Sequence, residues 1–290
     1  MPEAGRAIMA FHFTKLRRLQ AAAANADEEA IHDMRVAIRR VRAAFRIARP
    51  YFRRKVVRSF QTELRALADE LGAARDLDVI ISHALAFASR QPPDAPKLDA
   101  YLGHLRARRA SAQQELLDHF GSRRLARFSD AFEAFLAAPE SEDSAGVPRV
   151  CDAIPAAIWE QYSLVRAYEA ITEPTLETLH ALRIDFKRLR YLLEFFKGIL
   201  GRSAVHLIEL TVRAQDHLGL LQDATVASTM LRKYIAEQAT LSGTDLAAAA
   251  AYLTELQNEI QMRQESFREV FRSITDRSFR RLLARLLSNI

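Results

Sequence analysis

The sequence predicts an all-α protein built from two helical bundles that arose by internal duplication. Nine glycines and nine prolines in 290 residues leave few turns, and 49% of the residues are hydrophobic. Alanine and leucine, which favour helices, are abundant in the chain. A motif of the first half returns in the second half. Length and composition therefore allow one or two domains with a sizeable core.

Short breaks divide the first half of the chain into helices. Asn25 or Asp27 can cap the second helix, because either side chain accepts hydrogen bonds from the free N–H groups of a helix start. Pro50 marks the end of that helix, since proline cannot continue the hydrogen-bond ladder. The helices expected in the first half span residues 5–24, 31–49, 53–71, 79–89, 98–119 and 123–136.

Two breaks are expected after the third helix. Gly72 is expected to end it, and Asp76 or Asp78 is then placed to cap the helix that follows. Residues 91–97 (QPPDAPK) contain three prolines and are expected to form a linker.

The helix expected over residues 31–49 has two adjacent stripes of opposite character. At about 100° per residue, an apolar stripe that resembles an ordinary core face lies next to a row of cations. The apolar stripe consists of Ile31, Met34, Ile38, Val41, Phe45 and Ala48. The cationic row consists of His32, Arg35, Arg39, Arg42, Arg46 and Arg49.

The cationic row destabilises its own helix. Its members form like-charge pairs three or four residues apart, each costing about 0.2–0.5 kcal/mol, so that the row costs about 1–2 kcal/mol. No acidic residue occurs between Met34 and Thr62 to offset this repulsion. The whole chain has a net charge of only +6, so the concentration of cations on one helix is more informative than the total. We therefore expect an external anion along the row.

The motif of this helix is repeated. Residues 180–190 (HALRIDFKRLR) repeat residues 32–42 (HDMRVAIRRVR) at an offset of 148. Downstream, residues 217–223 (HLGLLQD) repeat residues 70–76 (ELGAARD) at an offset of 147. Two ordered blocks at a nearly constant offset indicate a duplication.

The domain boundary is expected between the two copies. The stretch 137–148 is small, polar and contains proline and glycine. We expect a first bundle at 1–138, a linker at 139–148 and a second bundle at 149–290.

The second copy also has a basic row, formed by His180, Arg183, Lys187 and Arg190. Much of the remaining helix surface is apolar, which is typical of a buried helix, so the row is expected to line a cavity or the seam between the halves. Buried cations require partners. We expect the acidic candidates within the chain to be too few for two such rows; they are Asp33, Asp76, Asp185 and Asp223.

Several functional classes are disfavoured by the sequence. The single cysteine, Cys151, excludes an internal disulfide framework and a thiolate-rich metal site, and it fits a reducing compartment. The N-terminus lacks the apolar region of a signal peptide, and no apolar run is long enough to span a membrane. The histidines do not occur in the spacings typical of metal sites. We therefore expect a cytoplasmic protein without a metal or other cofactor.

The repeated motifs resemble the CHAD family (conserved histidine α-helical domain). The pattern H-x-x-R-x-x-x-[RK]-R-x-R occurs twice, and L-G-x-x-[RQ]-D follows each copy. The resemblance extends from about Gly5 to the end of the chain. It implies two helical bundles related by a pseudo-twofold axis, with a basic channel between them. It also implies binding of inorganic polyphosphate and recruitment to polyphosphate granules.

The resemblance also implies which residues of this sequence line the basic channel, because the family's basic residues can be matched to it by position. Arg18 and Arg75 are further candidates, and Arg46 continues the first row. Gln222 stands where the first copy has Arg75, and Lys187 where it has Arg39, so the second half is expected to bind less strongly. The residues that match the lining are His32, Arg35, Arg39, Arg42, His180, Arg183, Lys187 and Arg190.

The expected function is therefore non-catalytic binding of polyphosphate, with granule-associated proteins as further candidate partners. Each guanidinium fork can bind two phosphate oxygens, so a row of arginines suits a linear polyanion. His32 and His180 contact phosphate, orient an arginine or are structural histidines with satisfied hydrogen bonds. One alternative is a nucleic-acid binder that uses the same rows, although aromatic side chains for base stacking are not interleaved with them. The other is a phosphoanhydride-processing enzyme with a histidine acceptor.

Overall fold

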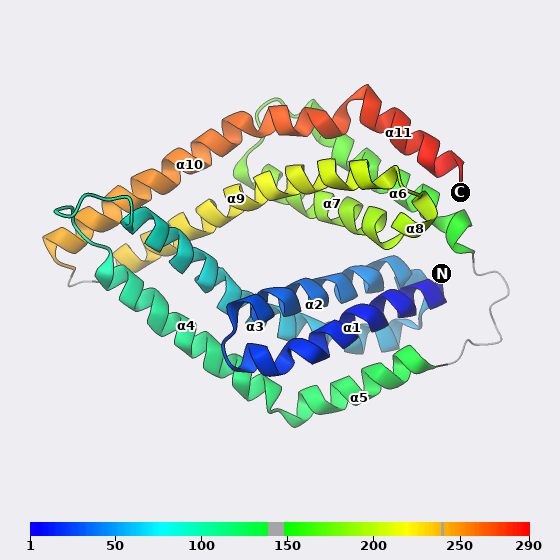
Figure 1. The fold of residues 1–290 in the computed structure, drawn as a ribbon, viewed down its shortest axis with the longest axis horizontal. Helices are drawn as coiled ribbons and strands as arrows, with labels where there is room; N and C mark the ends of the chain where they lie inside the picture. The colour runs from blue at the N-terminus through cyan, green and yellow to red at the C-terminus, as the bar shows by residue number, and fades with distance from the viewer. Residues whose placement is uncertain (139–147, 239–240) are drawn as a thin grey trace. The chain divides into compact units, whose positions relative to one another are not determined.

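The computed structural model describes residues 1–138, 148–238 and 241–290, and every regular element in these ranges is a helix (Figure 1). The all-α prediction is thus confirmed. The linker expected at 139–148 lies almost wholly outside the described residues. The chain divides into two compact units, Met1–Val147 with Ser242–Ala248 and Pro148–Leu241 with Ala249–Ile290. The grouping of residues 242–248 with the first unit was not expected from the sequence pattern.

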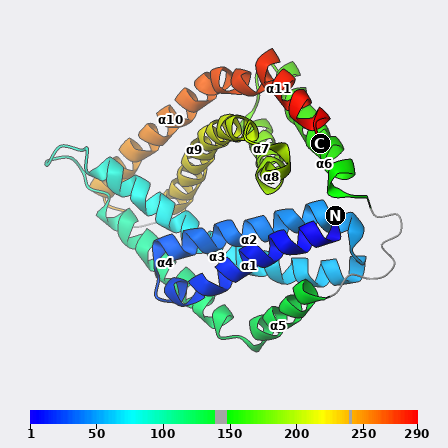
Figure 2. The ribbon, with the colours of Figure 1, turned by 45° about the vertical axis from the view of Figure 1, so that its right-hand side comes forward.

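The first unit is a helical bundle in which α2 packs against both α1 and α3 (Figure 2). The helix α3 also packs against the next helix along the chain. The helices that lie wholly in this unit are α1 (Pro2–Ala24), α2 (Glu28–Ala48), α3 (Arg54–Ala88), α4 (Asp99–Phe120) and α5 (Arg123–Ala137).

The apolar stripe of α2 forms the centre of this bundle. All six of its predicted members are at most 1% exposed, which confirms the predicted core face. Phe45 contacts the rings of Phe60, Phe132 and Phe135, which come from α3 and α5. The stripe therefore fixes the rotation of α2 about its own axis.

Both ends of α2 have a local cause. Asp27 is the N-cap, and its Oδ1 accepts hydrogen bonds from the N–H groups of Glu29 and Ala30, both at 2.9 Å. At the other end the 3₁₀ turn η1 (Arg49–Tyr51), which contains Pro50, separates α2 from α3. The sequence thus placed this helix correctly to within a few residues.

The break predicted at Gly72 is wrong. The helix α3 continues for 35 residues from Arg54 to Ala88, and Gly72 is buried within it. Glycine in a helix costs only about 1 kcal/mol relative to alanine, which the packing of a long helix offsets. Asp76 and Asp78 are therefore interior residues of α3 and cap no helix. In the second unit, Asp223 likewise lies inside a long helix.

The second unit contains a similar succession of long and short helices. Its basic row lies on α7, which packs against α6 and α9. Its helices are α6 (Val150–Ala167), η2 (Tyr168–Ala170), α7 (Leu176–Phe195), α8 (Lys197–Leu200), α9 (Ala204–Glu237), most of α10 (Gly243–Thr275) and α11 (Arg277–Ser288). None of the helices in the described part of the chain is apolar enough over a sufficient length to cross a membrane.

The expectation that α7 is buried all round is only partly right. Leu182, Phe186 and Leu189 are at most 1% exposed and form its core face. However, Ile184 is 36% exposed and His180 is exposed, so one side of α7 is accessible to solvent. An exposed apolar residue on a helix is common, and it explains why apolar content alone overstated the burial of this helix.

The continuous α3 helix yields a stability prediction for Gly72→Ala. A Cβ at this position would meet only the Nη2 atom of Arg35, at 4.0 Å, which is an ordinary van der Waals distance. Alanine loses less backbone entropy on folding, so we expect the free energy of unfolding to rise by about 0.5–1 kcal/mol. Denaturant unfolding followed by circular dichroism measures this change.

Gly5→Ala is the matched control. A Cβ at Gly5 would lie 2.5 Å from the Cβ of Ala48, so α1 and α2 would have to move apart. We expect a loss of about 1–3 kcal/mol from overpacking. A destabilised Gly72→Ala variant would contradict the account of α3 as an unstrained continuous helix.

Candidate functional site

The basic row of α2 lies along the edge of the first unit's core. His32, Arg46 and Arg49 are exposed, whereas the central members of the row, Arg35, Arg39 and Arg42, are partly buried. The burial of the neighbouring apolar stripe holds the helix in one orientation. This orientation places the cations at the edge of the core. The row is therefore a fixed set of donors along one edge of a rigid helix.

One member of the row has an acidic partner within the chain. Nη1 of Arg35 donates to Oδ1 of Asp76 at 2.6 Å, which joins α2 to α3. The absence of acids near the row in sequence therefore does not mean that every cation lacks one in space. Both side chains are about a third to a half exposed, so this pair adds little stability. Its main effect is to orient the Arg35 guanidinium.

Desolvation acts on the central part of the row. The Nε atom of Arg39 is buried and has no hydrogen-bond partner among the described residues. Burial lowers the pKa of Arg42; nearby Asp69 opposes this effect and Arg65 adds to it. Arginine remains charged at neutral pH in such surroundings. The protein supplies only some of the hydrogen-bond acceptors that these guanidinium groups can use. A bound anion would supply the others.

His32 lies in a cationic environment. Partial burial lowers its pKa, and the charges of Arg75, Arg39 and Arg35 lower it further, against the opposite effect of Asp33. Burial and the same cations that would attract an anion therefore favour the neutral imidazole over the imidazolium. Arg75 of α3 lies close enough to the row to act on His32.

Arg18 is less directly connected to the row. It is exposed on α1, one turn beyond Lys15. Lys15 forms an ion pair between the two helices, with its Nζ 2.7 Å from Oδ2 of Asp33 on α2. The structure therefore supports Arg18 only as an exposed cation on the neighbouring helix.

The basic row of α7 in the second unit is partly satisfied by its own neighbours. Nδ1 of His180 lies 2.6 Å from Oε1 of Gln222 on α9, and since an amide oxygen only accepts, Nδ1 donates. Nε of Arg190 donates to Oε1 of Glu194 at 2.6 Å. Arg183 and Lys187 are partly buried. Gln222 stands where the first copy has Arg75. The histidine of the second copy therefore has a hydrogen-bonding neighbour where that of the first copy has a cation.

The end of the α2 row forms one side of a pocket that sequence reasoning missed. The pocket has a volume of about 540 Å³ and lies between α2 and α3. Neither Arg58 nor Arg65 was among the predicted site residues. The available signal was the seven-residue spacing of Arg58 and Arg65, which places both on one face of α3. The lining consists of Arg42, Arg46, Arg49, Arg58, Gln61, Thr62 and Arg65.

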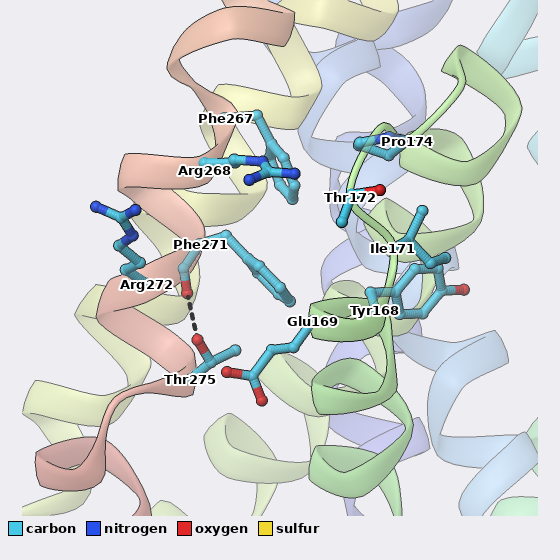
Figure 3. A pocket seen from close by; sticks show the side chains of 10 residues that line it. All are labelled: Tyr168, Glu169, Ile171, Thr172, Pro174, Phe267, Arg268, Phe271, Arg272 and Thr275. Atoms are coloured by element: carbon cyan, nitrogen blue, oxygen red, sulfur yellow. Dashed lines mark hydrogen bonds between the residues drawn. The ribbon is translucent and has the colours of Figure 1, made fainter.

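A second pocket, in the second unit, has a different character. It has a volume of about 210 Å³, and Figure 3 shows Phe267 and Phe271 of α10 opposite the segment that follows η2. None of the predicted site residues lines it. Among the described residues, no three histidine, cysteine, aspartate or glutamate side chains come together as a metal site would require.

Comparisons with known proteins identify the family of the chain. The family model for the CHAD domain matches residues 7–232. The chain belongs to the CHAD family. This match stops short of the C-terminal helices α10 and α11, whereas the motif resemblance was expected to extend to the end of the chain. No curated protein matches the sequence at a significant level.

Solved structures extend the similarity of this CHAD protein over nearly its whole length. PptA from Streptomyces chartreusis is 15% identical, with a TM-score of 0.76, and the alignment covers 94% of this chain and 99% of that one. The CHAD domain from the plant Ricinus communis is 23% identical, with a TM-score of 0.69, and the coverage is 93% and 91%. At these identities the similarity establishes a shared fold.

The environment of His32 leads to a prediction about anion binding. A phosphate anion near Arg39 and Arg75 would favour the imidazolium, so we expect long-chain polyphosphate bound along the row to raise the pKa of His32. Protons are then taken up on binding, and the affinity should increase as the pH falls through the His32 pKa. NMR titration of the imidazole resonance, assigned with the His32→Asn variant, measures the shift. A pKa of His32 that does not respond to bound long-chain polyphosphate would place the anion elsewhere.

Proposed function

We propose that this CHAD protein binds inorganic polyphosphate without catalysis, and that this binding recruits it to polyphosphate granules in the cytoplasm. The observation that carries the proposal is the basic row of α2, held by a fully buried apolar stripe in a member of this family. A row of guanidinium groups along one helix can bind successive phosphates of a linear polyanion, because each fork takes two phosphate oxygens. Other granule-associated proteins are proposed as further partners.

The row of α7 is proposed as a second, weaker element of the same function. Arg183 and Lys187 repeat Arg35 and Arg39 of the first copy in sequence. However, Arg190 has Glu194 as an ion-pair partner, and His180 has Gln222 as a neighbour in place of an arginine. Its net attraction for a polyanion is therefore smaller, and single substitutions in α2 should weaken binding more than those in α7.

Nucleic acid is the second candidate ligand, because its phosphates would also be attracted to the rows. Single-strand binders usually stack bases on aromatic side chains interleaved with the cations. Phe45, the aromatic residue nearest the α2 row in sequence, is 0% exposed and packs among other phenylalanines. This burial favours a ligand that carries phosphates and no bases.

Titration with long-chain polyphosphate tests the proposal. We expect tight binding that weakens by about a thousandfold between about 50 and 200 mM salt if about six phosphates are contacted. Single-stranded RNA of equal phosphate content should bind much more weakly. Equal affinity for both polymers would favour the nucleic-acid alternative, and failure to bind polyphosphate at low salt would refute the proposed function.

Charge reversal within the rows locates the binding site. We expect the Arg39→Glu, Arg183→Glu double variant to lose polyphosphate binding, because each substitution places a repulsive charge within a row. The matched control is Arg54→Glu, Lys55→Glu, since both side chains are exposed at the start of α3. Fluorescence anisotropy with labelled polyphosphate compares the variants, and a loss as large in the control would move the site away from the rows.

A folded double variant is required for that interpretation. The row of α2 is self-repelling, so removal of Arg39 should not unfold the protein. Circular dichroism and thermal unfolding test this point, and the neutral variant Arg39→Gln, Arg183→Gln repeats the binding measurement without a reversed charge. Unfolding of both variants would show that the arginines are structural partners.

A further inference from the structure

The pocket at the end of the α2 row gathers positive charge from two helices, and Asp69, which acts on Arg42, offsets part of it. Five guanidinium groups line it, contributed by Arg42, Arg46 and Arg49 of α2 and η1 and by Arg58 and Arg65 of α3, and no lining residue is acidic. At the other end of the row, by contrast, Arg35 is paired with Asp76. Like charges gathered in one concavity favour a small ligand of high negative charge.

The available hydrogen-bond donors of this pocket are almost entirely guanidinium groups. Thr62 lines the pocket, but its hydroxyl donates to the backbone carbonyl of Arg58 at 3.0 Å within the helix. Gln61 contributes an amide, and no aromatic side chain is present on which a base would stack. The lining therefore suits phosphate oxygens and offers nothing specific to a nucleoside.

The size and place of the pocket point to one part of a phosphate chain. Its volume of about 540 Å³ is in the range of small-ligand sites and is smaller than that of a long groove. It lies where the row stops, because Pro50 and the turn η1 end α2. A chain that follows the row would therefore reach this pocket with its end.

We propose that this arginine pocket binds the doubly charged terminal phosphate of a phosphoanhydride. A terminal phosphate has three acceptor oxygens and a charge of about −1.5 to −2 at neutral pH, whereas an internal phosphate of the chain has about one charge. Several guanidinium forks can then bind one group from different sides. This inference rests on the proposed polyphosphate-binding function and adds a recognition site for the end of the ligand.

The terminal phosphate can belong to a free short oligophosphate or to the end of a long chain. Tripolyphosphate is the probe for the pocket, and calorimetric titration measures its affinity for the full-length protein. We expect Arg58→Glu, Arg65→Glu to weaken tripolyphosphate binding by at least about tenfold, because two charge-assisted contacts are replaced by repulsion. Binding of long-chain polyphosphate should fall by a smaller factor, since the row on α2 remains.

Two controls separate the pocket from general electrostatics. Arg54→Glu, Lys55→Glu changes the net charge equally on the same helix but outside the pocket, and should leave tripolyphosphate binding nearly unchanged. The neutral variant Arg58→Gln, Arg65→Gln keeps the measurement informative if the reversed charges disturb folding. Equal losses in the pocket variant and in the control would overturn the proposal.

Competition distinguishes the two sources of the terminal phosphate. Long polyphosphate with free ends should displace tripolyphosphate, whereas the same polymer with both ends blocked as phosphoramidates should not. If neither polymer displaces it, the pocket recognises a free oligophosphate. If the blocked polymer displaces it as well as the free one, the pocket does not recognise a terminal phosphate and the proposal fails.

Failure of this proposal is distinguishable from failure of the proposed function. Wild-type protein that binds long-chain polyphosphate but not tripolyphosphate would refute the pocket and leave the row intact. Binding of tripolyphosphate without binding of the long chain would instead refute the proposed function and retain the pocket.

Discussion

The burial of the apolar stripe of α2 is the constraint on which the candidate site depends. Full burial of a side chain such as Ile31, Met34 or Phe45 contributes about 1.5–3 kcal/mol. Five such side chains in the stripe outweigh the about 1–2 kcal/mol by which the adjacent cations repel one another. Rotation of the helix about its axis would expose the stripe and would not separate the cations, because their spacing is fixed by the helix itself. The core therefore decides where the row is displayed, and the row has no means of relaxing by rotation.

Acidic residues offset the positive charge of the row to different extents along its length. Asp76 pairs with Arg35, and Asp33 pairs with Lys15 on the neighbouring helix, so negative charge gathers at the N-terminal part of α2. At the other end, the pocket residues of α2 and α3 are cations or neutral amides and hydroxyls. The pocket thus offers five cations to an anion, and Asp69 near Arg42 offsets part of their charge. Ion pairs of this exposed kind mainly orient side chains and contribute little to stability.

The two units use the same helix pair with different chemistry around the histidine. In the first unit the cations of α2 and α3, Arg75 foremost among them, lower the pKa of His32 beyond the effect of burial. In the second unit, Gln222 of α9 accepts a hydrogen bond from His180. In the first copy Arg75 lowers the pKa of the histidine. In the second copy Gln222 stands at that position, and its side-chain oxygen orients the histidine through a hydrogen bond. The copies are accordingly expected to differ in how their histidines respond to a bound anion.

Helical periodicity and charge pattern were enough to predict the all-α class, the core face of α2 and the row of cations, because each depends on residues a few positions apart. They narrowed the N-cap of α2 to Asn25 or Asp27, and the structure shows that it is Asp27. Gly72 shows the limit of local reasoning. Its cost of about 1 kcal/mol suggested a break, whereas packing along 35 residues of α3 overrides that preference.

The partner of Arg35 and the arginine pocket were decided only by tertiary structure. Asp76 lies 41 residues from Arg35, and Arg65 meets the end of the α2 row only because α2 and α3 pack side by side. No short-range pattern specifies such pairs, since they depend on the rotation and register of two helices. The sequence by itself therefore determined which residues bear the charge and which face is buried. The packing of the helices decided which charges meet, because electrostatic contacts depend on distance in space and not on distance along the chain.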